Sequence, residues 1–157
     1  MMTDKTKRIE TLELPNEILL KEARTLIAEG HDVTLRVRGV SMRPFLEDRR
    51  DKIVLTRVQG VNVGDAVLAE IAPGKYVYHR IIRIDGDDVT LKGDGNVYGT
   101  EQCRLKDIAA TTKELIRKEC HYSLQGMAWR CYSVLWPQWS FARRVLLKLY
   151  RVFRCYK

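Results

Sequence analysis

The chain has 157 residues, of which 45% are hydrophobic and 31% are charged, as is typical of one globular domain. This balance excludes disordered, collagen-like and coiled-coil chains. The net charge is +8, and residues 113–157 account for all of it because they hold ten Lys and Arg against two Glu. The basic surplus predicts an anionic partner for the C-terminal part of the chain.

Residues 1–30 are expected to form a polar lead-in and one amphipathic helix. Pro15, Asn16 and Glu17 are typical of a helix start. Apolar residues then recur at helical spacing as far as Gly30, which is expected to end the helix. The sequence holds neither the apolar core of a signal peptide nor a run of about 20 apolar residues that could span a membrane. We therefore expect a cytoplasmic location.

Residues 31–115 are expected to form a β domain. In residues 33–38 apolar and polar side chains alternate, as in a half-buried strand. Turn sequences at residues 73–74 and 85–87 separate three later strand candidates at hairpin distance. The candidates after the first are residues 52–57, 65–71, 75–84, 88–92 and 108–112. The pattern predicts a mainly β fold, either a sandwich or a partly closed barrel.

Residues 116–157 are expected to form a basic, aromatic, helical extension. Within residues 141–157 the apolar side chains share one arc of a helix. The opposite arc carries the cations that would face a membrane: Arg143, Arg144, Lys148, Arg151 and Arg154.

Two interpretations of this helix stay open. Its apolar arc could pack on the β domain, or the helix could lie in an anionic membrane interface on the inner membrane face. Nucleic acid is not a favoured partner, because no recognition motif accompanies the charge.

Two short segments could carry chemistry. Ser41 follows the first strand in the segment Arg-Gly-Val-Ser-Met-Arg-Pro. A sharp turn there would expose its hydroxyl and leave nearby N–H groups free to bind an oxyanion. His79 lies on an apolar face of the strand candidate 75–84. Such a setting favours the neutral imidazole, which a serine nucleophile needs as its general base.

Five segments in a fixed order resemble the S24/S26 serine peptidases, the family that joins LexA-type self-cleaving repressors with type I signal peptidases. In chain order they are residues 35–44, 51–54, 63–67, 78–82 and 91–96. Together they span about half of the chain. The resemblance implies the partly closed β fold of that family and places Ser41 at the position of the nucleophile.

His79 falls where LexA-type proteins and bacterial signal peptidases have a lysine. The archaeal and endoplasmic-reticulum signal peptidases have His followed by Arg there. The resemblance therefore implies a Ser41–His79 dyad like that of this branch, without its membrane anchor. Asp94 is the first candidate for an acid that orients the imidazole, and Glu101 or no third residue are the alternatives. The backbone N–H groups of Ser41 and Met42 are the candidate oxyanion donors.

We therefore expect a serine endopeptidase that cleaves an extended peptide or protein precursor without a metal or other cofactor. The alternative is a catalytically inactive binding module of the same fold, held at a membrane surface by its basic C-terminal helix. A hydrogen bond between Ser41 Oγ and His79 Nε2 is the feature that would favour the enzyme.

Overall fold

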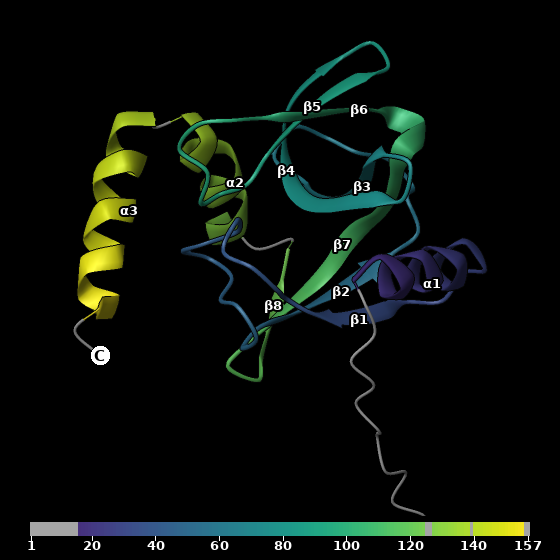
Figure 1. The fold of residues 1–157 in the computed structure, drawn as a ribbon, viewed down its shortest axis with the longest axis horizontal. Helices are drawn as coiled ribbons and strands as arrows, with labels where there is room; N and C mark the ends of the chain where they lie inside the picture. Colours follow the sequence, from purple (N-terminus) through teal and green to yellow (C-terminus); the bar gives the residue numbers. More distant parts are fainter. Residues whose placement is uncertain (1–15, 125–126, 139, 156–157) are drawn as a thin grey trace, which may run out of the picture.

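An antiparallel sheet forms the body of the molecule, with one helix before it in the chain and two after it (Figure 1). The structure, a computed structural model, describes residues 16–124, 127–138 and 140–155. Within these ranges the elements are α1 (Asn16–Ala28), β1 (Val33–Arg36), β2 (Lys52–Thr56), β3 (Ala66–Ala72), β4 (Lys75–Asp85), β5 (Asp88–Lys92), β6 (Glu101–Arg104), a 3₁₀ turn (Leu105–Asp107), β7 (Ile108–Arg117), β8 (Cys120–Ser123), α2 (Met127–Gln138) and α3 (Ser140–Cys155).

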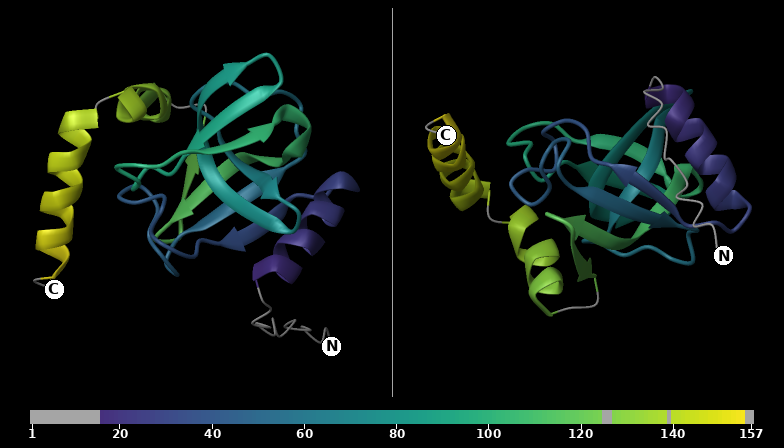
Figure 2. Two further views of the ribbon diagram at one scale, coloured as in Figure 1. Left: turned by 45° about the horizontal axis from the view of Figure 1, so that its top comes forward. Right: turned by 90° about the horizontal axis from the view of Figure 1, so that it is seen from below.

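The described strands form one eight-stranded sheet in the order β1-β2-β7-β3-β4-β5-β6, with β8 added beside β7. The sheet curls strongly, and α1 lies on the opposite side of the body from α2 and α3 (Figure 2). The expected architecture is confirmed: a mainly β domain with an N-terminal helix and a C-terminal helical extension.

Strand β3 lies between two apolar clusters, which explains why its sequence is apolar without alternation. Ala66 and Leu68 pack into the cluster that α1 covers, whereas Val67 and Ala69 pack into the other. Successive side chains of a strand point to opposite faces, so a strand buried on both faces is apolar throughout. Both clusters are thus held together by one central strand.

The sheet extends further than the sequence predicts. Strand β7 continues to Arg117 and turns back into β8, so strands reach Ser123 beyond the expected end of the β domain at residue 115. Lys118 and Glu119 make the turn with positive φ values of 49° and 63°. Such turns normally carry Asn or Gly, and a Lys-Glu pair gave no turn signal.

The C-terminal helices attach to the body through aromatic and basic side chains. Trp129 and Tyr132 of α2 contact the ring of Phe45, at centroid distances of 4.7 and 4.8 Å. On α3, the Arg143 guanidinium donates a 2.7 Å hydrogen bond to the Asn96 carbonyl. No helix in the described ranges is long and apolar enough to cross a membrane.

The orientation of α3 differs from the expectation that its apolar arc packs on the β domain. Arg143 is 2% exposed and faces the body, so its proposed place at a membrane is wrong. Arg144 and Lys148 are exposed, while the side chains of Arg151 and Arg154 lie outside the described part. The described apolar residues Val145, Leu146, Leu149 and Val152 are 44–49% exposed and do not pack on the β domain. The face of α3 that packs on the body carries the buried Arg143 and Leu147. It is neither the exposed apolar face nor the side that carries Arg144 and Lys148.

Candidate active site

Ser41 lies in a tight turn that follows β1. The turn begins at Gly39, whose φ of +88° is strained for residues with a side chain. The Gly39 N–H donates a 2.8 Å hydrogen bond to Asp48 Oδ1, and the Leu46 N–H donates to the Met42 carbonyl. These bonds hold the segment around Ser41 against the loop that leads to β2.

His79 of β4 is held by a carboxylate from β6. His79 Nδ1 lies 2.9 Å from Glu101 Oε2, with the imidazole 7% exposed and the carboxylate 28% exposed. An ionised carboxylate can only accept a hydrogen bond, so Nδ1 carries the hydrogen and donates it. In this tautomer of the neutral ring, Nε2 is left as an acceptor.

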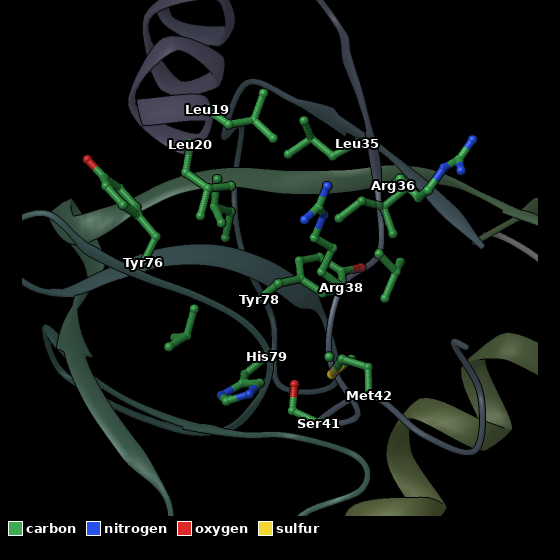
Figure 3. Close-up of a pocket in the computed structure, with 15 residues that line it drawn as sticks. Leu19, Leu20, Leu35, Arg36, Arg38, Ser41, Met42, Tyr76, Tyr78 and His79 are labelled. Carbon is green, nitrogen blue, oxygen red and sulfur yellow. The ribbon is translucent and has the colours of Figure 1, made fainter. Parts of the chain in front are cut away.

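Ser41 and His79 line the same cavity, which measures about 240 Å³. Figure 3 shows the Ser41 hydroxyl turned toward the imidazole. In the described part of the chain, Ser41 Oγ makes no hydrogen bond to His79 Nε2. The rest of the lining is mostly apolar and includes Leu19 and Leu20 of α1, Leu35, Val37 and Met42, and Tyr76 and Tyr78 of β4. Arg36 and Arg38 line the cavity as well.

Two backbone N–H groups of the Ser41 turn are candidates for binding an oxyanion. Arg43 N–H donates to the Val40 carbonyl at 3.2 Å, and the Ser41 carbonyl accepts from Gly95 N–H at 2.7 Å. Among the described residues, the N–H groups of Ser41 and Met42 have no hydrogen-bond partner. Free N–H groups beside a hydroxyl can stabilise an oxyanion.

Asp94 does not contact His79, so the first candidate for the orienting acid is wrong. Both of its carboxylate oxygens accept hydrogen bonds from Arg80, at 2.8 and 2.6 Å, and both side chains are buried. A third Arg80 nitrogen donates to the Gly64 carbonyl at 2.6 Å. Burial alone would lower the pKa of Arg80, but Asp94 outweighs this effect and raises it. Arg80 and Asp94 therefore form a buried ion pair in which each charge is the partner of the other.

The loop that carries Asp94 packs directly behind Ser41. A Cβ atom at Gly93 would lie 2.5 Å from the Ser41 carbonyl oxygen, and one at Gly95 would lie 2.7 Å from the Val40 carbonyl oxygen. Only glycine leaves room for this approach. The Lys-Gly-Asp-Gly-Asn segment thus positions the Ser41 turn instead of supplying the acid beside His79.

Helix α2 covers the Arg80–Asp94 pair. The guanidinium carbon of Arg80 lies 4.9 Å from the ring centroid of Trp129. Trp136 Nε1–H donates to the Asp94 carbonyl at 3.0 Å, and the Tyr132 hydroxyl donates to Asp94 Oδ2 at 3.1 Å. Burial raises the pKa of the Tyr132 phenol far above its usual value, so it remains a donor. The C-terminal extension therefore supports the loop behind Ser41.

Glu101 is the site residue that the sequence left as one alternative among three. It opens β6, a four-residue strand in which only Cys103 is apolar and buried. So short a strand has no readable periodicity. The pairing of Glu101 with Leu91 in β5 brings the carboxylate beside β4. In the sequence, Glu101 was indicated only by its position a few residues after the Lys-Gly-Asp-Gly-Asn segment.

Comparison with known proteins places this arrangement in a family. No curated protein matches the chain significantly. The family model described as Peptidase S24-like matches residues 3–113, which is more than half of the chain and includes Ser41, His79 and Glu101. The chain therefore belongs to the Peptidase S24-like family.

Proposed function

We propose that this protein is a serine endopeptidase of the signal-peptidase-like type, in which Ser41, His79 and Glu101 act together. The observation that carries the proposal is the 2.9 Å contact between Glu101 and Nδ1 of His79, a residue that lines the same cavity as Ser41. A nucleophile, a base and a group that orients the base are the three parts such catalysis needs.

In the proposed reaction, His79 Nε2 takes the proton of Ser41 as Oγ attacks the carbonyl carbon of a peptide bond. The N–H groups of Ser41 and Met42 stabilise the oxyanion that forms. The C–N bond then breaks, and the imidazolium returns its proton to the leaving amine, which leaves an acyl-enzyme. Water attacks this ester with His79 again as base, and the imidazolium then returns its proton to Ser41 Oγ as the new carboxylic acid leaves. Glu101 holds the ring in the required tautomer and stabilises its charged form.

The proposal of an extended substrate is supported by unpaired strand edges beside the cavity. Among the described residues, β1 pairs only with β2, and residues 75–79 of β4 pair only with β3. The backbone groups of both segments can therefore pair with an added strand. A peptide in this position would place alternate side chains in the apolar cavity beside Ser41.

The test is labelling of the purified protein by a serine-reactive acylating probe, measured by intact mass. We expect one probe molecule per chain, and loss of labelling in Ser41→Ala and His79→Ala. Ser123→Ala is the matched control, because Ser123 lies on the exposed strand β8, and it should label as the unchanged protein does. Labelling that persists in Ser41→Ala would contradict the proposal.

A second candidate is a catalytically inactive binding module of the same fold. It is favoured by one observation: Ser41 Oγ makes no hydrogen bond to His79 in the described part of the chain. Catalytic hydrogen bonds are often long before substrate binds, so the same labelling experiment separates the two candidates. A folded protein that no probe labels, but that binds extended peptides, would support the binding module.

A further inference from the structure

We propose that the outward face of α3 binds an anionic lipid bilayer. This face, here called the α3 outer face, consists of Val145, Leu146, Leu149 and Val152 with the cations Arg144 and Lys148 beside them. The inference does not depend on catalysis and holds for either candidate function.

The inner face of α3 is already occupied by the body of the protein. Arg143 and Leu147 are 2% and 4% exposed, and the Tyr150 hydroxyl donates a hydrogen bond to Glu47. Arg143 also donates to the Asn96 carbonyl. These contacts fix which side of the helix can meet another surface.

The α3 outer face is apolar and lacks a covering element within the described chain. Its four apolar side chains are 44–49% exposed. They recur at the spacing that puts residues on one side of a helix, at positions 145, 149 and 152, with 146 beside them. Figures 1 and 2 show α3 at the margin of the molecule, away from the sheet. Apolar side chains grouped in this way indicate a binding surface.

The positive charge of α3 favours an anionic partner. Residues 140–157 contain six Lys and Arg and no acidic residue. Lys148 is exposed, and the exposed Arg144 lies with its guanidinium carbon 4.9 Å from the ring of Tyr98. An apolar stripe edged by cations inserts into the acyl boundary while the cations reach anionic headgroups.

A second copy of the chain fits this surface less well. Two α3 helices packed through their outer faces would bring the exposed Arg144 and Lys148 of both copies together, and residues 140–155 hold no acidic residue to balance them. Like charges at such a contact are repulsive. A bilayer that contains anionic lipid, by contrast, buries the apolar side chains at its acyl boundary and neutralises the cations with its headgroups.

The first test is co-sedimentation of the full chain with phosphatidylcholine vesicles with and without phosphatidylglycerol. Only the vesicles with phosphatidylglycerol should bind the unchanged protein strongly. Leu146→Glu/Leu149→Glu should lose about a hundredfold in partition coefficient, because each leucine moved into lipid is worth a factor of about ten. Ile18→Glu/Val63→Glu is the matched control, since these residues are 49% and 53% exposed elsewhere. It should bind as the unchanged protein does.

The second test removes charge. Arg144→Gln/Lys148→Gln should bind anionic vesicles about thirtyfold more weakly, whereas Lys75→Gln/Lys106→Gln, at exposed sites outside α3, should not change binding. The proposal is overturned if the unchanged chain ignores anionic vesicles, or if Leu146→Glu/Leu149→Glu binds them equally well. It is also overturned if the unchanged chain is a dimer that this variant converts to a monomer, because a second copy then covers the face.

Discussion

The side chains of His79 and Arg80 point to opposite faces of β4, and each meets a different carboxylate. His79, which lines the cavity, contacts Glu101, whereas Arg80 and Asp94 form a buried pair under α2. One carboxylate is therefore placed to orient a base, and the other to neutralise a buried cation. At the scale of single residues, this difference can be measured by changing each carboxylate alone.

Glu101→Gln should slow labelling of Ser41 by about 10²- to 10⁴-fold without unfolding the protein. The glutamine amide can donate to Nδ1 and thereby favour the tautomer with hydrogen on Nε2, which cannot accept the Ser41 proton. The measurement is the rate constant of acylation, with thermal unfolding run beside it. Glu101→Asp should recover part of the rate. Labelling of Glu101→Gln at the unchanged rate would show that Glu101 does not position His79.

Asp94→Asn should instead destabilise the fold by about 3–5 kcal/mol, because it leaves the buried Arg80 without a counter-charge. Urea unfolding measures this loss. The double variant Arg80→Met/Asp94→Leu should be more stable than Asp94→Asn, since it removes both charges together. If Asp94→Asn unfolds at the same urea concentration as the unchanged protein, the ion pair does not stabilise the fold.

The elements position Ser41 through a close backbone contact between two loops. The loop after β5 reaches the turn after β1, and its Gly93 and Gly95 face the carbonyl groups of Ser41 and Val40. The same loop is held from behind by Trp136 of α2. The place of Ser41 thus depends on elements that are far from it in the sequence.

Gly93→Ala should cost about 1–3 kcal/mol of stability, because its Cβ would meet the Ser41 carbonyl oxygen at 2.5 Å and the backbone must move. Ser41 would move with it, so labelling of the folded variant should slow by more than about tenfold. Gly60→Ala is the control, since a Cβ there meets nothing within 4 Å and its φ is not in the left-handed region. Equal behaviour of the two variants would contradict the close contact.

At the scale of the whole molecule, Asp51 joins several segments. Its carboxylate accepts hydrogen bonds from the Arg50 side chain and from the Glu47 N–H, and Arg117 of β7 lies 3.9 Å away. Burial by itself would raise the pKa of Asp51, but the hydrogen bonds and charge of Arg50, with the backbone donors, hold it below its usual value.

The stability that Asp51 contributes should therefore depend on pH. It is complete above the pKa of an unfolded Asp, about 3.9, and is lost as pH falls through the lower folded value. The difference in unfolding free energy between the unchanged protein and Asp51→Asn should be constant from about pH 7 to 5 and shrink below about pH 4. Asp85→Asn, at a residue whose side chain is 70% exposed, should show little difference at any pH. A difference for Asp51→Asn that grows in acid would contradict the assigned sign.

Much of the fold could be predicted because its signals are local. The helix before β1 is described as Asn16–Ala28, and β5 covers the expected residues 88–92. Strands β6 and β8 were missed. The first has too few apolar residues for a pattern, and the second follows a Lys-Glu turn that carries no turn residue. Local patterns reveal an element only where its burial and its turns follow the usual chemistry.

The sequence by itself determined the mainly β class, the turn at Ser41, the strand that carries His79, and the basic character of the last helix. Each of these follows from periodicity, turn residues or charge within a short stretch. Only the tertiary structure decided that Glu101 and not Asp94 meets His79, and that α3 buries Arg143 while its apolar residues face outward. Which carboxylate meets a base, and which helix face meets the body, depends on contacts between segments that a local pattern does not encode.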